Sequence, residues 1–421
     1  MHDTATATAS GRGGPGGGAR GDQDLVTDSD LQALLDNHGK ALRSGDERKF
    51  LTAYDPAATD LVATQRMLFG NLRKIPLTLA SFSLSHQSAD VDPGPAVSLD
   101  VDVSFVHQIT GVDVDKVFEG YRWRVTRKAP GAALLVTSVG GTPTHSHYAK
   151  YLYYPAPWDQ VPLTVIREPH VLLLANPVTA SLARQWAGTA ELSARQDLAA
   201  WGGRPNGAPG FLVTFEDVRT RFYSYWDGNG TGTSWEAAYT MSLPGYSETD
   251  GELDRAMGSR IVSYTGSSFY KPGHDPGYMF THEMAHALVA TVGPRSGSRT
   301  PLYIVEGFAR FMETRHRSAQ PFLQDPALAA YVKNGFTGHL PTDGQLRSAD
   351  DDVAGASYEL SLLVYLFIEH KFGSARCFDL VVSAYETPTE SGGSAALTKA
   401  TGMSVAAFEA EWSSYVHQRI G

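Results

Sequence analysis

Cysteine is almost absent from this sequence, because Cys377 is the only one among 421 residues. A single cysteine excludes a disulfide within the chain and a zinc site built from thiolates. The segment RCFDL around it is typical of a helix. We therefore expect Cys377 to be a small, buried, apolar residue.

Basic runs and long apolar runs are missing as well. The formal net charge is -10 and no cluster of Lys and Arg forms a basic stripe, which argues against a nucleic-acid partner. No segment has 18 consecutive apolar residues, so we expect no membrane-spanning helix. What remains is a globular chain, 42% hydrophobic, with enough length for two or three domains.

Helical and then strand-like patterns fill the first third of the chain. Residues 1–24 are rich in Gly, Ala and Thr and predict a flexible tether. Leucines at helical spacing predict a helix near residues 28–45, and two shorter helices follow. From residue 77 the period changes to two, which predicts four long strands within 77–86, 96–108, 115–128 and 132–140.

Helices followed by an antiparallel meander predict an α+β cone, in which a curved sheet wraps around a helix. This order resembles the nuclear-transport-factor-2-like (NTF2-like) fold over residues 25–150. Such domains often hold a pocket, so the resemblance allows a small ligand there. We expect His107 and Tyr121 to be packing or surface residues and not ligands.

The second part of the chain follows a linker predicted at residues 151–162 and extends over residues 163–421. A strand over residues 163–176 leads into a helix at 179–202, and further strands are predicted at 210–216 and 260–266. The remainder is mainly helical. A small sheet followed by helices is therefore expected in this second domain.

The segment MFTHEMAHALVATVG, residues 279–293, carries the clearest chemical pattern in the sequence. On a helix His282 and His286 lie one turn apart on the same face, with Glu283 beside them. Two imidazoles in this arrangement bind zinc, and a zinc hydrolase needs a nearby carboxylate. The alternative is a pair of core histidines on an amphipathic helix.

A third ligand is available on the next predicted helix, in PLYIVEGFARFMET. Pro301 suits the start of a helix, and Glu306 follows an apolar turn in which a carboxylate needs a partner. The residues between His286 and Glu306 suffice for one helix to end near Gly293, a loop to turn, and a second helix to return antiparallel. His282, His286 and Glu306 are therefore the candidate metal ligands.

These two segments resemble the gluzincin metallopeptidases, and most closely the bacterial peptidase-MA-like domains. The resemblance covers roughly residues 160–421 and rests on THEMAHAL followed by YIVEGFARFME. It implies a mostly helical, thermolysin-like domain with a small sheet that holds one zinc ion per chain on His282, His286 and Glu306. It also implies that Glu283 is the general base that takes a proton from the zinc-activated water. Proteins of this group often pair the peptidase domain with an NTF2-like module.

Two further residues match positions in the aminopeptidase-like branch of that family. Glu313, seven residues after Glu306, matches a glutamate that hydrogen-bonds a ligand histidine, here His282; the alternative is a solvated helix residue. Tyr358, in YELSLLVYLFIEHKFG, matches a tyrosine that donates to the tetrahedral oxyanion. The alternative is that Tyr358 only begins a buried helix.

The sequence also departs from the exopeptidase pattern. That branch recognises a substrate amino terminus with a Gly-x-Met-Glu-Asn strand, whereas this chain has Ala-Met-Gly-Ser at 256–259. Val305 stands where many relatives have asparagine. Recognition of a free amino terminus is therefore not implied.

Together these patterns predict a zinc metallopeptidase that hydrolyses peptide bonds in a peptide or protein substrate. Two alternatives stay open, namely an inactive zinc protein that acts as a binding or scaffolding module, and a zinc hydrolase with a non-peptide substrate. Because relatives of this type are commonly exported, we expect an extracytoplasmic protein, secreted or tethered to a membrane; the alternative is a cytoplasmic one. The sequence gives no basis for an oligomeric state.

Overall fold

A computed structural model describes residues 26–84, 97–141, 153–227, 236–247, 251–294 and 299–420. The expected tether at residues 1–24 and a turn expected at 92–94 lie outside these ranges. Among the described residues, no helix is long and apolar enough to cross a membrane.

The N-terminal part has the element order that the sequence predicts. A capping box starts the first helix. The Asp30 backbone N–H donates to Thr27 Oγ1, and the Thr27 backbone N–H donates to the Asp30 carboxylate. The first elements are α1 (Asp28–Ser44), α2 (Glu47–Leu51), α3 (Thr59–Leu72), β1 (Leu77–Leu84), β2 (Val97–Ile109), β3 (Val117–Arg127) and β4 (Leu135–Gly140).

The second part begins with a short helix and a mixed set of strands and ends in helices only. Its first elements are α4 (Pro157–Gln160), β5 (Thr164–Arg167), β6 (Val171–Ala175), α5 (Ala180–Trp201), β7 (Phe211–Glu216), α6 (Arg219–Ser224), β8 (Ala238–Ser247) and β9 (Gly251–Tyr264), with a 3-10 turn at Tyr225–Asp227. After a 3-10 turn at Ser268–Tyr270 come α7 (Gly277–Ala290), α8 (Leu302–Arg315), α9 (Gln320–Leu323), α10 (Pro326–Asn334), α11 (Asp343–Leu346), α12 (Asp351–Phe372), α13 (Ser374–Glu386), α14 (Glu390–Thr401) and α15 (Val405–Ile420).

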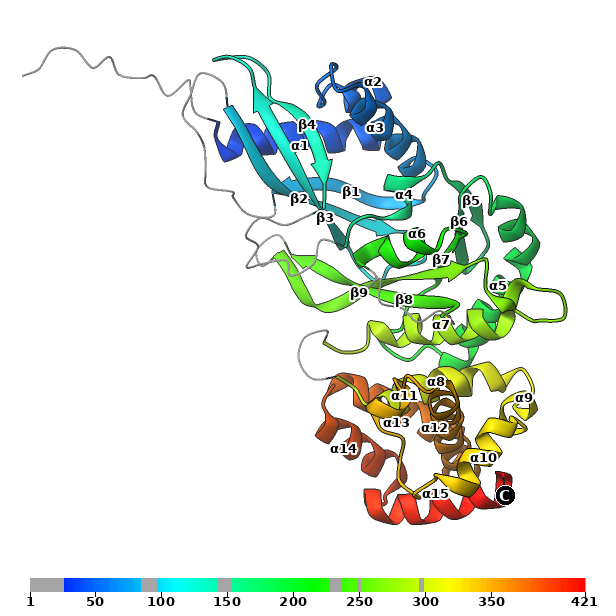
Figure 1. Cartoon of the computed structure of the whole chain (residues 1–421). Helices are drawn as coiled ribbons and strands as arrows, with labels where there is room; N and C mark the ends of the chain where they lie inside the picture. The colour runs from blue at the N-terminus through cyan, green and yellow to red at the C-terminus, as the bar shows by residue number, and fades with distance from the viewer. Residues whose placement is uncertain are drawn as a thin grey trace, which may run out of the picture.

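One sheet connects the two parts, with strand order β1-β2-β3-β8-β9-β7-β6-β5 and β4 beside β3. The two halves meet through the antiparallel pair Val117↔Gly245 between β3 and β8. In Figure 1 the strands occupy the upper part of the molecule, helices α8 to α15 gather below them, and α7 lies between. The predicted α+β class, a sheet-rich N-terminal part followed by a helical C-terminal part, is confirmed.

Two hydrophobic cores lie on opposite faces of the central strands. In β6, Leu172 and Leu174 face the core shared with the N-terminal part, while Val171 and Leu173 face the core of α5, α7 and the C-terminal helices. Every residue of β6 is buried, because both faces of this strand are covered. Helix α5 covers this strand, while α7 packs against α5, β8 and β9.

The structure corrects three local expectations. The strand predicted over residues 163–176 is two antiparallel strands, β5 and β6, separated by a turn. Strand β8 was not predicted at all, and β9 begins well before residue 260. The linker at residues 151–162 stays a prediction. It contains the short helix α4, where the Asn71 side-chain amide donates to the carbonyl oxygen of the buried Trp158 at 2.9 Å. The domain boundaries and the NTF2-like resemblance stay predictions.

Candidate metal centre

Helix α7 presents both histidines on one face. Apolar residues on its other faces, among them Met284 and Leu288, are buried in the core beneath the sheet. His282 and His286 lie one turn apart, and their ring nitrogens Nε2 approach to 3.1 Å. Each histidine side chain is about one sixth exposed (16% and 17%), so the pair opens to solvent on one side.

Helix α8 brings the third candidate ligand to the same point. Glu306 Oε2 lies 3.3 Å from His282 Nε2 and 3.4 Å from His286 Nε2. The close packing of α8 against α12 requires Gly307, since a Cβ there would lie 2.6 Å from the Ser361 carbonyl oxygen. The three predicted ligands therefore converge, and they form a group that could hold a metal ion.

The spacing of these donors suits zinc. An ion about 2.0–2.2 Å from each of three tetrahedral ligands leaves neighbouring donor atoms a little over 3 Å apart. The observed separations are 3.1, 3.3 and 3.4 Å. Two imidazole nitrogens and one carboxylate oxygen are also a donor set that zinc uses at catalytic sites. The residues present thus fit this metal.

The charged groups at the centre strongly affect one another's pKa values. Burial alone would lower the pKa of His282, but hydrogen bonds to Glu306 and Glu313 outweigh it and raise this pKa to about 10. Burial would raise the pKa of Glu306, yet the facing His286 and His282 hold it well below its usual range. The histidines and the two carboxylates therefore stabilise one another's charges.

Glu313 and Arg310 form a second layer behind His282. His282 Nδ1 lies 2.6 Å from Glu313 Oε1, which makes Nδ1 the protonated nitrogen and turns Nε2 toward Glu306. Arg310 Nη1 donates to both Glu313 oxygens at 3.1 Å. Its Nη2 lies 3.5 Å from Glu359 Oε1, on α12. The structure thus places Glu313 against the histidine, buried and not solvated.

Glu283 lies on the sheet side of the centre. Thr240, on β8, donates through Oγ1 to Glu283 Oε2 at 2.7 Å. Glu236 lies just before β8, and burial followed by the charge of Glu283 raises the pKa of Glu236 to about 7. Sequence reasoning missed Thr240 and Glu236 because it missed the strand. The alternation of Tyr239, Met241 and Leu243 was the available signal.

Tyr358 lies on α12, near enough to Glu306 and Glu283 for the charges of both to affect its pKa. Burial, and then the charge of Glu306, raise its pKa, and Glu283 contributes in the same direction. The Arg310 guanidinium lies 5.6 Å from the Tyr358 ring centroid. The phenol therefore stays protonated and lies within the electric field of both carboxylates.

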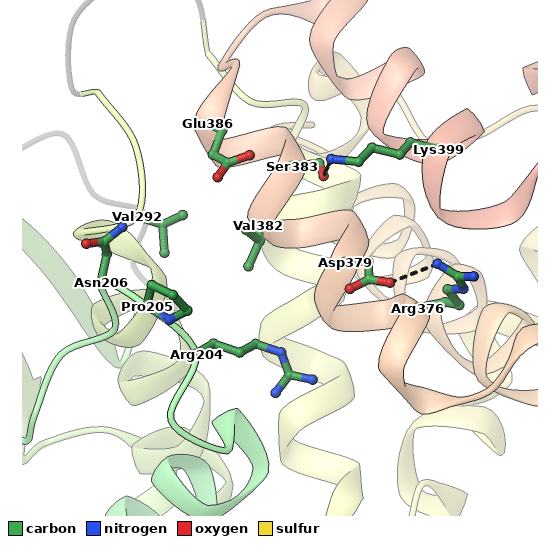
Figure 2. Close-up of a pocket in the computed structure, with 10 residues that line it drawn as sticks. All are labelled: Arg204, Pro205, Asn206, Val292, Arg376, Asp379, Val382, Ser383, Glu386 and Lys399. Atoms are coloured by element: carbon green, nitrogen blue, oxygen red, sulfur yellow. Dashed lines mark hydrogen bonds and ion pairs between the residues drawn. The ribbon is translucent and has the colours of Figure 1, made fainter.

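A cleft of about 420 Å³ lies elsewhere, beyond the C-terminal end of α7 (Figure 2). Four of its charged side chains contact neighbours: Arg376 donates to Asp379 at 3.1 Å, Lys399 donates to Ser383 at 3.1 Å, and Arg204 lies over the Phe378 ring. The convergence of donor atoms distinguishes the histidine centre from this cleft. The cleft is lined by Arg204, Pro205, Asn206, Val292, Arg376, Asp379, Val382, Ser383, Glu386 and Lys399.

Comparisons with known proteins give little information about the function, which we therefore infer from the geometry of the site. No known protein family profile matches the chain, and no curated protein matches it. Among solved structures it is similar to an M1 zinc metallopeptidase from Deinococcus radiodurans, with 13% identity and a TM-score of 0.35. That alignment covers 80% of this chain and 95% of the other. At this identity and TM-score the likeness carries no argument about function.

Proposed function

We propose that this protein is a zinc-dependent metallopeptidase of the gluzincin type that hydrolyses peptide bonds. The observation that supports it most is the convergence of His282, His286 and Glu306 at 3.1–3.4 Å, with Glu283 on the adjoining position of the same helix. Three ligands leave one tetrahedral position open, which is the arrangement of catalytic zinc sites.

Each site residue has a distinct role in this proposal. Zinc, when bound, lowers the pKa of a water molecule and polarises the substrate carbonyl. Glu283 accepts the proton of the attacking water and delivers it to the leaving amine. Tyr358, protonated, donates a hydrogen bond to the oxyanion. Glu313 holds His282 in the tautomer that leaves Nε2 for the metal.

The scaffold alternative has less support. A structural zinc site is usually closed by four protein ligands, whereas only His282, His286 and Glu306 converge among the described residues. A structural site also has no use for a carboxylate at Glu283. A non-peptide substrate is an outcome of the test below.

The test combines metal analysis with cleavage of a peptide library, with and without a chelator. We expect one zinc per chain and cleavage that stops on chelation and returns with zinc. Glu306→Ala should lose both metal and cleavage, and Glu283→Gln should keep the metal while turnover falls by at least about 10²-fold. Stable zinc without cleavage of any peptide would reject the peptidase. Full occupancy in Glu306→Ala would reject the third ligand.

A further inference from the structure

Strand β8 passes alongside α7, and its register directs one hydroxyl at Glu283. Thr240 pairs with Ile261 of β9 across the sheet. Its neighbour Tyr239 points to the opposite face, where the Tyr239 hydroxyl lies 2.7 Å from the Phe222 carbonyl and 3.0 Å from that of Tyr225. Because side chains alternate along a strand, this anchoring turns Thr240 toward α7.

The Thr240 hydroxyl makes two contacts with the same residue. Its Oγ1 lies 2.7 Å from Glu283 Oε2 and 3.0 Å from the Glu283 backbone carbonyl oxygen. A hydroxyl has one proton, so the shorter contact, to the carboxylate, is the main hydrogen bond. A carboxylate whose one oxygen is held in this way keeps its second oxygen available for a proton.

We propose that Thr240 is a positioning residue for Glu283, a role that rests on the metallopeptidase function proposed above. By fixing Oε2 it restricts the rotation of the carboxylate and orients the other oxygen for proton transfer. The competing explanation is structural: the hydroxyl satisfies the α7 carbonyl group and only attaches the strand to the helix. The two explanations predict different behaviour when Glu283 itself is changed.

The first measurement compares Thr240→Val, which has nearly the same shape but no hydroxyl, with Thr240→Ser, which keeps the donor. A hydrogen bond to a charged group contributes about 1.5–3 kcal/mol, so turnover should fall about 10- to 100-fold in the valine variant. KM and zinc content should stay near wild-type values. The serine variant should recover most of the turnover. Equal turnover in all three proteins would overturn the proposal.

The second measurement places Thr240→Val in the Glu283→Gln background. If the hydroxyl acts through the carboxylate, the double variant should be no slower than Glu283→Gln alone. A structural role would instead lower the residual rate by the same factor as in the wild type. That additive result would also overturn the proposal.

A binding measurement keeps the proposal testable without peptide hydrolysis. Acetohydroxamate, added to the zinc-loaded protein, can donate its hydroxyl proton to Glu283, so its affinity reports the orientation of that carboxylate. We expect Thr240→Val to weaken binding several-fold and Thr240→Ser to restore it. If the wild type cleaves no peptide while this pattern holds, the proposed function fails and the role of Thr240 stands. If the wild type cleaves peptides and the affinity is unchanged in Thr240→Val, only the role of Thr240 fails.

Discussion

Two buried clusters in this molecule use the same kinds of side chain, yet only one has the geometry of a metal centre. In the first, here called the arginine cluster, His107, Asp113, Glu119 and Arg260 meet between the N-terminal strands and β9. The second is the candidate metal centre around His282 described above. Both combine histidine, carboxylates and arginine, so composition alone does not distinguish them.

The difference lies in what occupies the middle of each cluster. In the arginine cluster the Arg260 guanidinium is the central cation, 2.6 Å from Asp113 Oδ1 and 3.2 Å from His107 Nε2. Burial, and then the charge of Arg260, lower the pKa of His107 to about 3, so this histidine stays neutral. At the candidate metal centre Arg310 stands behind Glu313, and the three donor atoms face one another directly. We expect a cation from outside the chain to occupy this position at the candidate metal centre.

The largest effect that tests this comparison is expected for Arg260→Met. Removing the guanidinium leaves Asp113 buried without its cation, which should reduce the free energy of unfolding by about 3–5 kcal/mol. Zinc binding by the folded protein should be unchanged, because Arg260 is not among the residues that contact the three ligands. Urea unfolding followed by circular dichroism measures the loss.

A matched double variant checks the cause. Asp113→Asn keeps an oxygen for the Ile109 backbone N–H, which donates to Asp113 Oδ2 at 2.8 Å, and removes the charge. Combined with Arg260→Met it should recover part of the lost stability. A double variant as unstable as the sum of both single changes would show that the pair itself contributes little.

Local patterns indicated the candidate ligands, whereas the surroundings of these residues depend on long-range pairing. The spacing of His282 and His286 is a property of one helix, and Glu306 needed only a loop and a second helix. Thr240 was missed because Pro244 and Gly245 interrupt the strand pattern of β8, so the short alternation before them was not recognised as a strand. Arg260 and Asp113 are 147 positions apart in the sequence. They come into contact because β3 and β8 pair at Val117↔Gly245. Periodicity carries no information about such a contact. Cys377, expected to be buried in a helix, is buried in α13.

Tyr358→Phe is expected to have the next largest effect. Its raised pKa keeps the hydroxyl protonated and able to donate to an oxyanion, so its loss should lower turnover by about 10²- to 10³-fold. Zinc content should not change. Steady-state kinetics with zinc-loaded protein provides the measurement.

Tyr365, two turns later on α12, offers the matched control. Its hydroxyl donates to the Ile304 carbonyl oxygen at 2.9 Å, away from the donor atoms of the ligands. Tyr365→Phe should cost about 1 kcal/mol of stability and leave turnover nearly unchanged. If the two variants lose turnover equally, the Tyr358 hydroxyl has no special role.

A smaller effect is expected for Glu313→Gln, which removes the charge behind His282 but keeps the shape. Partners of this kind typically change metal affinity by about 10- to 100-fold. We expect zinc affinity, measured by competition with a chelator, to weaken within that range. Glu369→Gln, a change of the same type on α12 at a residue paired with Arg315, should leave the affinity unaltered. Equal affinities for wild type and Glu313→Gln would mean that Glu313 acts only in packing.

The smallest effect concerns a buried carboxyl that belongs to neither cluster. Asp197 on α5 is fully buried, and among the described residues no donor lies within hydrogen-bonding distance of either of its oxygens. Burial raises the pKa of Asp197 well above its usual range, although Arg317 opposes the shift. A carboxyl whose folded-state pKa is raised contributes stability below its unfolded pKa of about 3.9 and loses it as the pH rises toward the folded value.

Wild-type stability should therefore fall between pH 5 and pH 6 more steeply than that of Asp197→Asn, in which this group cannot titrate. The limiting slope for one carboxyl is about 1.4 kcal/mol per pH unit, and we expect a difference of about 1 kcal/mol over this interval. Urea unfolding at the two pH values measures it, and the subtraction cancels carboxyls common to both proteins. Parallel pH profiles would show that the pKa of Asp197 is not raised, because a hydrogen-bond donor or a cation stabilises its carboxylate. Asp197 would then resemble the carboxylates of the two clusters, whose charges have partners.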